Sequence, residues 1–182
     1  MIAALFVHAA GVYAGRPDVD LWPEERDARL YRGPWRVLAH PPCEHWSQLA
    51  HIHKHRPGMA YGDDGGCFGS ALADVEAFSG VLEHPAGSGA WSAYGLPEPP
   101  RVGGWVRGLF RPGWACHVEQ GHYGHPAPKA TWLYYVGPPP PELRWGPSGA
   151  TGRIDLMPSQ GPRRSATPPE FAEVMLMLAR AS

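Results

Sequence analysis

The feature that most limits how this chain can fold is its content of proline and glycine, 22 and 23 residues among 182. Proline removes a backbone hydrogen-bond donor and glycine is favoured in turns, so both residues divide a chain into short segments. The sequence therefore predicts modest helix content and many irregular connections. The 43% of hydrophobic residues indicates a globular protein, and the length predicts one domain over residues 1–182.

Charge, cysteine content and the N-terminal segment limit the possible partners and compartment. The formal net charge of −1 predicts no attraction of the whole chain to nucleic acid or to an anionic membrane. Three irregularly spaced cysteines argue against a disulfide framework and favour the cytoplasm. Residues 1–12 are apolar but lack a basic leader and a membrane-spanning length, so we interpret them as containing a buried strand and expect no membrane association.

Apolar segments bounded by glycine and proline predict alternating strands and helices. Helical spacing predicts a helix over residues 67–78, directly before a strand, which is typical of a βαβ unit. Ligands of such sheets lie beyond the carboxyl ends of the strands, so the turns after strands are the place to look for chemistry. The predicted strands are residues 2–7, 35–39, 80–82, 114–118 and 130–136.

The C-terminal segment predicts a further helix that packs against the sheet. Thr167 can cap it, and Pro168 suits its first turn. Helical periodicity indicates that its apolar residues belong to the core rather than to a cofactor site. Those that share one face are Phe171, Val174, Met175 and Leu178.

Two turns after predicted strands carry groups suited to catalysis. Residues 40–43 read His-Pro-Pro-Cys, and the two prolines fix the backbone so that the thiol of Cys43 can face a cleft. Glu83 ends the next predicted strand, and a parallel sheet would bring it beside Cys43. Alternatively, Cys43 is a buried packing residue and Glu83 a solvated loop residue, which are the common states of these residue types.

A third segment makes a family resemblance specific. Residues 123–129 have the pattern Tyr-Gly-x-Pro-x-x-Lys and lead into a predicted strand. Carbon-5 cytosine DNA methyltransferases carry a Pro-Cys turn, a Glu-Asn turn and a Tyr-Gly-x-Pro-x-x-Arg-x-Arg segment in this order, and the chain resembles their small phage-type members. His84 replaces the family's asparagine, while Lys129 and Thr131 replace its two arginines.

The resemblance implies a compact Rossmann-like methyltransferase fold of the α/β class, with a mostly parallel sheet and helices on both faces. It implies that Cys43 adds to carbon 6 of a pyrimidine, which makes carbon 5 nucleophilic, and that Glu83 holds the base and stabilises the charge created. The substrate would be DNA or a pyrimidine nucleotide. The substrate-binding residues implied by the matching positions are His84, Tyr123, Lys129 and Thr131.

The segment after the first predicted strand is similar in position to the family's cofactor loop, which implies S-adenosylmethionine as the methyl donor. The residues implied to contact it are Phe6, His8, Gly11, Asp20 and Pro41. Only about 27 residues separate Gly15 from Cys43, which leaves out the strand that the family usually has there. A second interpretation therefore keeps the thiol chemistry and uses a donor other than S-adenosylmethionine.

Three further interpretations stay open. Cys43 and His45 lie near His51, His53 and His55, which could bind zinc, although no paired ligand spacing is present. The chain could also be a catalytically silent module that binds nucleic acid. Finally, residues 137–163 contain no target-recognition domain, so a separate protein could select the target sequence.

Some basic and aromatic side chains are candidates for contacts to a nucleotide. Arg107 and Arg111 could bind phosphate, although most arginines are simply solvated. Trp46 and Trp91 follow the two candidate catalytic turns, and we expect them to line a pocket.

Overall fold

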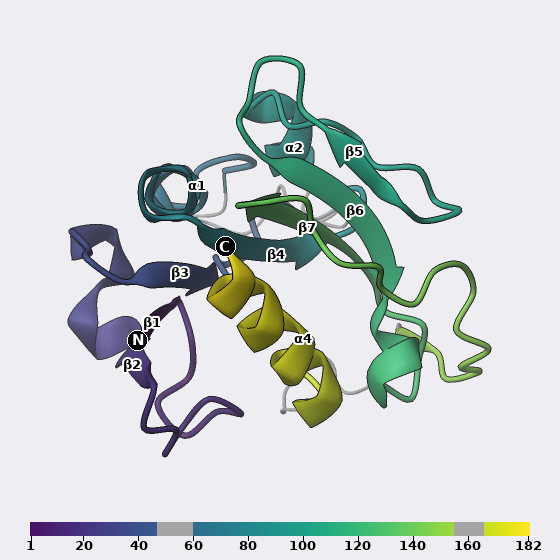
Figure 1. The fold of residues 1–182 in the computed structure, drawn as a ribbon, viewed down its shortest axis with the longest axis horizontal. Coiled ribbons are helices and arrows are strands. Elements are labelled where there is room, and N and C mark those ends of the chain that lie inside the picture. The colour runs from purple at the N-terminus through teal and green to yellow at the C-terminus, as the bar shows by residue number, and fades with distance from the viewer. Residues whose placement is uncertain (47–59, 155–165) are drawn as a thin grey trace.

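A computed structural model describes residues 1–46, 60–154 and 166–182 (Figure 1). The described residues form one seven-stranded sheet, three α-helices and short 3-10 helices. The strands are β1 (Ile2–Leu5), β2 (Val19–Trp22), β3 (Arg36–Ala39), β4 (Gly80–Pro85), β5 (Trp105–Arg107), β6 (Trp114–Glu119) and β7 (Ala130–Val136). The helices are α1 (Cys67–Phe78), α2 (Gly89–Ala93), α4 (Pro169–Ala181), η1 (Glu24–Arg26), η2 (Ala28–Leu30) and η4 (Gln120–Tyr123).

The sheet is mixed, which contradicts the expected Rossmann-like, mostly parallel arrangement. Its strand order is β2-β1-β3-β4-β7-β6-β5. The N-terminal strands β2, β1, β3 and β4 pair in parallel. The pairs β4 with β7, β7 with β6, and β6 with β5 are all antiparallel. The fold prediction is therefore wrong for the C-terminal half of the sheet, and three helices are fewer than a doubly wound fold requires.

Connection lengths explain this difference. Residues 108–113 join β5 to β6, and residues 120–129 join β6 to β7, with η4 as their only helical element. A parallel crossover needs a dozen or more residues, usually with a helix, so these connections favour antiparallel pairing. The apolar character of these strands was visible in the sequence, but their direction depends on what connects them.

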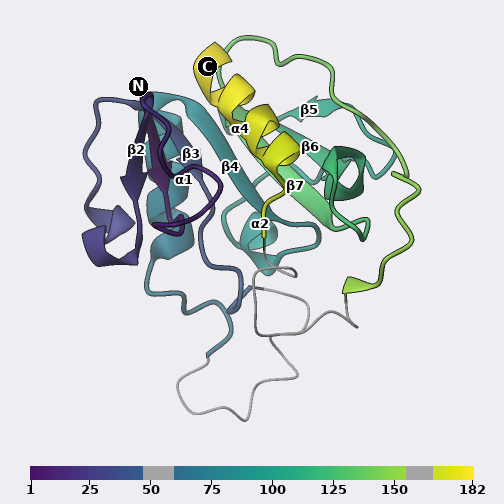
Figure 2. The same cartoon turned by 90° about the horizontal axis from the view of Figure 1, so that it is seen from below.

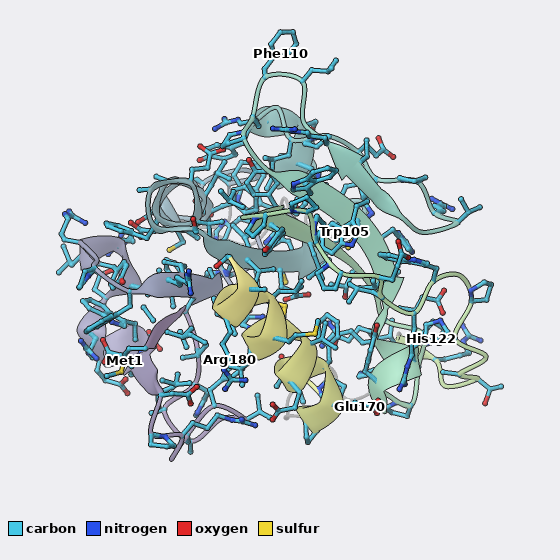
Figure 3. The ribbon with its side chains drawn as sticks, in the orientation of Figure 1. Met1, Trp105, Phe110, His122, Glu170 and Arg180 are labelled. Carbon is cyan, nitrogen blue, oxygen red and sulfur yellow. The ribbon has the colours of Figure 1, made fainter. Side chains whose placement is uncertain are left out.

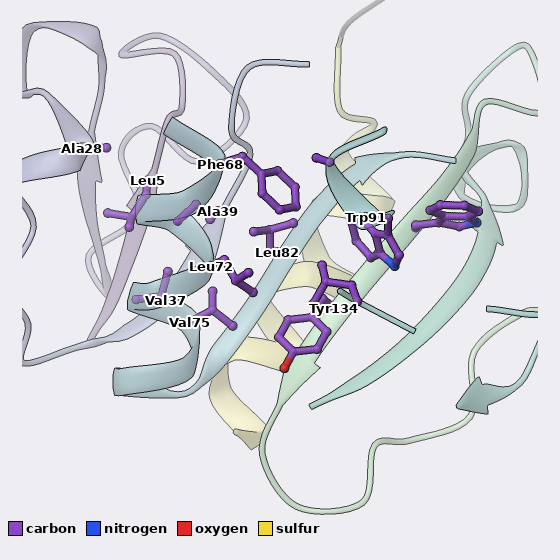
Figure 4. Close-up of a cluster of buried hydrophobic side chains, with 14 of the residues drawn as sticks. Leu5, Ala28, Val37, Ala39, Phe68, Leu72, Val75, Leu82, Trp91 and Tyr134 are labelled. Atoms are coloured by element: carbon purple, nitrogen blue, oxygen red, sulfur yellow. The ribbon is translucent and has the colours of Figure 1, made fainter. Parts of the chain in front are cut away.

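Each face of the sheet is covered by one long helix (Figures 1 and 2). The buried side chains between the sheet and α1 are called the α1 cluster, and those between the sheet and α4 the α4 cluster. Side chains of β3 alternate between the two, since Val37 and Ala39 belong to the α1 cluster and Leu38 to the α4 cluster. The α1 cluster includes Phe68, and Figure 4 shows this side of the core. The α4 cluster includes Phe171.

The local predictions have mixed outcomes. The helix over residues 67–78 is confirmed with the predicted bounds. Thr167 does not cap the C-terminal helix: Pro168 occupies the N-cap position without a side-chain hydrogen bond, and the helix begins at Pro169. A strand thought to be missing before Cys43 is present as β2, which is only four residues long.

The single-domain interpretation of residues 1–182 stays a prediction. Among the described residues, no helix has both the length and the apolar character needed to cross a membrane.

Gly80 allows the close approach of β4 to β3. Its φ of +138° is rarely adopted by other residues, and a Cβ there would lie 1.9 Å from the Val37 carbonyl oxygen.

We expect Gly80→Ala to lower the free energy of unfolding by more than about 3 kcal/mol, because backbone strain and overpacking add. Gly95 has a φ of +66° and open space around it. Gly95→Ala should therefore cost only about 1–2 kcal/mol. Urea unfolding measures both, and equal costs would contradict the contact.

Candidate active site

The parallel pairing of β3 with β4 builds the candidate site. Ala39 lies beside Leu82 in this register, so the next residues, His40 and Glu83, meet at the same edge of the sheet. His40 Nδ1 is 2.9 Å from Glu83 Oε2, and both side chains are 14% exposed. Cys43 follows three residues after His40. Two segments distant in sequence thus place a thiol, an imidazole and a carboxylate at one edge.

The turn that carries Cys43 is anchored on both sides. The Trp46 amide donates to the Cys43 carbonyl at 3.0 Å, and the Gly89 amide donates to the Trp46 carbonyl at 3.0 Å. The Trp46 indole donates to Asp64 at 2.8 Å, and Asp64 also accepts from the amide of Phe68 in α1. These contacts hold Cys43, which is half-buried, against the segment that follows β4.

The surroundings of Cys43 keep its thiol protonated. Burial raises its pKa to about 11, and the negative charges of Glu83 and Glu44 act in the same direction. The Lys129 ammonium acts in the opposite direction. These effects require the Glu83 carboxylate and the Lys129 ammonium to lie near the thiol. Cys43 is therefore a protonated thiol at neutral pH, and it must lose this proton before it can react as a nucleophile.

Glu83 is held by donors from two other elements. Besides His40, Gln120 donates from Nε2 to Glu83 Oε1 at 3.4 Å. Gln120 also donates to Thr131 Oγ1 at 2.9 Å. The other ring nitrogen of His40, Nε2, lies 2.9 Å from the Tyr13 hydroxyl. A continuous hydrogen-bonded network therefore runs from the segment after β1 through β3 and β4 to β7.

This network determines the charge state of Glu83. Burial acts to raise the pKa of its carboxyl, but the hydrogen bond from His40 and the nearby charges, including that of Lys129, outweigh burial, and the net pKa lies below its usual range. Burial also lowers the pKa of Lys129, against the opposing effects of Glu83 and Cys43. At neutral pH the site thus combines an ionised carboxylate with a neutral thiol.

The predicted substrate-binding residues fall in different places. Lys129 lies at the site, and one contact of its Nζ is the Ala166 carbonyl at 2.8 Å. Thr131 is fully buried and positions Gln120 rather than facing solvent. Tyr123 packs on Phe171 of α4.

His84 lies on the opposite face of the sheet from Glu83, because successive residues of a strand alternate. Its Nδ1 is 2.7 Å from Ser88 Oγ, and its ring packs against Phe68 of the α1 cluster. Burial lowers the pKa of His84 to about 4. The side chain is thus a neutral core histidine that supports the turn after Glu83.

The residues predicted to hold S-adenosylmethionine do not form a matching site. Residues 6–18, all of which the structure describes, connect β1 to β2 without a helix, whereas nucleotide-type cofactors are usually held by a glycine turn that opens a helix. His8 is exposed. Gly11 takes part in a local turn, in which its amide donates to the His8 carbonyl at 2.9 Å.

The other three residues predicted to contact the cofactor have structural roles, one through hydrogen bonds and two through packing. Asp20 accepts hydrogen bonds from Trp22 at 2.9 Å and from Arg26 at 2.6 Å, so both carboxylate oxygens are already used. Phe6 has a φ of 57° at the sharp turn after β1 and packs against the α1 cluster. Pro41 is buried. We therefore derive no step through S-adenosylmethionine.

The arginines proposed for phosphate lie far along the sheet from Cys43. Arg107 ends β5, and Arg111 lies in the turn to β6, where it is paired with Glu76 at 2.9 Å. This turn projects from the molecule at Phe110 (Figure 3). It joins the start of β6, whereas Gln120 follows the end of that strand. These arginines are not part of the site.

Of the two tryptophans expected to line a pocket, the structure places one at a hollow, and it describes only part of the expected zinc-binding residues. Trp91 lines a hollow of about 300 Å³ together with Trp132, next to the Ser88 turn. Trp46 does not line this hollow and packs in the core against Phe68 and Tyr94. Within residues 1–46, 60–154 and 166–182, no group of three potential metal ligands is found. The three histidines of the zinc interpretation, His51, His53 and His55, lie outside the described residues.

Comparison with known proteins identified no similar protein. The chain matches no protein-family model, no curated protein and no solved structure. The site must therefore be interpreted from its own geometry.

Sequence reasoning missed three members of the network: Tyr13, His40 and Gln120. His40 lies in the same motif as Cys43, and its polar side chain directly after a buried strand was an available signal. Gln120 begins the segment that includes Tyr123, and it carried a weaker signal of the same kind. Tyr13 carried none, because its partner is 27 residues away.

Two charge variants should change the reactivity of Cys43 in opposite directions. Glu83→Gln removes a negative charge, lowers the thiol pKa and should speed alkylation by iodoacetamide at pH 8 by about three- to tenfold. Lys129→Gln removes a positive charge and should slow it by a similar factor. Mass spectrometry of the Cys43 peptide measures the rate. Buried Cys116 should stay unreactive in both variants, and a change in the same direction would contradict this electrostatic account.

Proposed function

We propose that this protein modifies carbon 5 of a pyrimidine, with Cys43 as the nucleophile and Glu83 as the group that holds the base. The observation that carries the proposal is the meeting of both groups at one edge of the sheet, close enough that the Glu83 charge raises the pKa of Cys43. A thiol and a carboxylate are the two groups that this chemistry needs. The order of the three sequence motifs supports the same reaction.

The chemistry follows from the properties of the ring. Carbon 5 of cytosine is a weak nucleophile until a thiolate adds at carbon 6, which converts the ring to an enamine. Negative charge then develops at the ring nitrogen and exocyclic group, where a carboxyl group can stabilise it by hydrogen bonding. After carbon 5 has taken an electrophile or a proton, solvent water removes a carbon-5 proton, the carbon–sulfur bond breaks and the Cys43 thiolate leaves with the ring restored. The proton held at the ring nitrogen returns through Glu83 to the thiolate.

The resting site already contains the proton that the reaction needs. Cys43 carries it and Glu83 does not, whereas addition requires a thiolate and a proton donor to the ring. Transfer of one proton from the thiol to the carboxylate and on to the base satisfies both requirements, with no net uptake from solvent. The nearby Lys129 charge favours both anions and can also contact the phosphate of the target nucleotide.

The proposal covers activation of carbon 5 and not the group transferred to it, because the expected methyl-donor residues do not form a site. The substrate is DNA or a pyrimidine nucleotide, and a base within a duplex would have to be flipped out to reach Cys43. Residues 137–153 form neither helix nor strand. Selection of a target sequence by a separate protein therefore belongs to the proposal.

A base analogue tests the thiol chemistry without a methyl donor. A single-stranded oligonucleotide with 2-pyrimidinone in place of cytosine is more electrophilic at carbon 6, so Cys43 should form a covalent adduct visible in the intact protein mass. Cys43→Ser should abolish the adduct, and Cys67→Ser should retain it. Noncovalent binding that is unchanged in Cys43→Ser, with no adduct, would instead support the catalytically silent binding module.

The shared proton predicts an unusual pH dependence. Exchange of the carbon-5 hydrogen of dCMP in D₂O should be independent of pH between about pH 5 and pH 8, because the active form has one proton on the Cys43 and Glu83 pair. At higher pH it should decline as Lys129, whose pKa burial lowers, loses the charge that favours both anions. The rate should fall below the lowered Glu83 pKa, where a second proton binds, and near pH 11, where the thiol loses its proton. A rate that rises tenfold per pH unit from 7 to 10 would show that free thiolate is required.

A further inference from the structure

His40 is bound at both nitrogens of its ring, which is more than packing at a strand end requires. Nδ1 lies 2.9 Å from Glu83 Oε2, and Nε2 lies 2.9 Å from the Tyr13 hydroxyl. The three side chains come from the segment after β1, the end of β3, and β4. Tyr13 is only 3% exposed and packs within the α4 cluster. The imidazole is therefore fixed between a buried hydroxyl and a carboxylate.

The directions of these hydrogen bonds follow from the partners. Burial and the Glu83 charge raise the pKa of Tyr13, so its hydroxyl keeps its proton and can donate to His40 Nε2. The Glu83 carboxylate can only accept, so His40 Nδ1 carries a proton and donates it to Oε2. The opposite tautomer would place an Nδ1 lone pair against the carboxylate. Glu83 thus sets the direction of its bond with His40, and the Tyr13 hydroxyl holds the ring at its other nitrogen.

The two oxygens of Glu83 are consequently not equivalent. Oε2 is occupied by the 2.9 Å contact with His40. Among the residues that the structure describes, Oε1 has a long contact of 3.4 Å from the Gln120 amide, which also bonds Thr131 at the shorter distance of 2.9 Å. Oε1 is the oxygen with more capacity to accept or deliver a proton at a bound base.

We propose that His40 and Tyr13 are positioning residues: Tyr13 holds the His40 ring in place through Nε2, and His40 turns Glu83 so that Oε1 is presented to the pyrimidine. This inference rests on the proposed function. Neither residue needs to touch the base, since both act through the carboxylate. Loss of either side chain should change the orientation and the pKa of Glu83 more than it changes the affinity for the substrate.

The test compares His40→Ala with His40→Asn, whose amide can donate from nearly the same position as Nδ1. His40→Ala should lower kcat for carbon-5 hydrogen exchange on dCMP about tenfold or more, with a smaller change in KM. It should also move the acid limb of the pH profile upward, because Glu83 loses its main donor. His40→Asn should recover most of both effects. Tyr13→Phe should lower kcat by about two- to fivefold.

Two controls separate this inference from the proposed function. Tyr135→Phe alters another buried tyrosine of the α4 cluster, one that contacts Trp105, and should leave the profile unchanged. Titration of ¹³C-labelled Glu83 by NMR needs no substrate, and its midpoint should rise in His40→Ala and return in His40→Asn. An unchanged midpoint in His40→Ala overturns the inference. Absence of exchange in the wild type, with the midpoint shifted as expected, overturns the proposed function and leaves the positioning of Glu83 supported.

Discussion

The parallel pairing of β3 with β4 is the contact on which the rest of the site depends. Gly80 lets the β4 backbone approach Val37, and the resulting register places His40 beside Glu83. A slip of one residue would turn Glu83 toward the α1 cluster and His84 toward the α4 cluster. Pro41 and Pro42, which belong to neither helix nor strand, then connect β3 to Cys43. One strand pair therefore sets the distance between the thiol and the carboxylate.

The antiparallel half of the sheet completes this site. Because β7 runs antiparallel to β4, the start of β7 lies where β4 ends, and Thr131 pairs with Pro85. Lys129 and Gln120 reach Glu83 only through this arrangement. In a parallel strand at the same place, the residues before the strand would lie at the opposite edge. The feature that overturned the expected fold is thus the one that brings the third sequence motif to the first two.

Burial has opposite net outcomes for the two reactive groups of the site. Burial keeps the Cys43 thiol neutral, while hydrogen bonds and positive charge keep the Glu83 carboxylate ionised despite burial. A buried carboxylate without such donors would become neutral, and the pair would hold one proton too many for the proposed reaction. The hydrogen bond from His40 and the positive charge of Lys129 are therefore as necessary to the proposed reaction as the two groups that would touch the base.

The sequence by itself determined the short elements, the bounds of α1, the apolar strand segments and the turns that carry Cys43 and Glu83. These depend on local periodicity and on proline and glycine, which act within a few residues. It did not reveal the partners of Thr131, Tyr123 and Asp20, because these hydrogen bonds and packing contacts do not follow from periodicity. Only the tertiary structure decided the strand directions, the face on which each polar residue lies, and the charge states of the site. Those properties arise from contacts between distant segments and from burial, which no local pattern encodes.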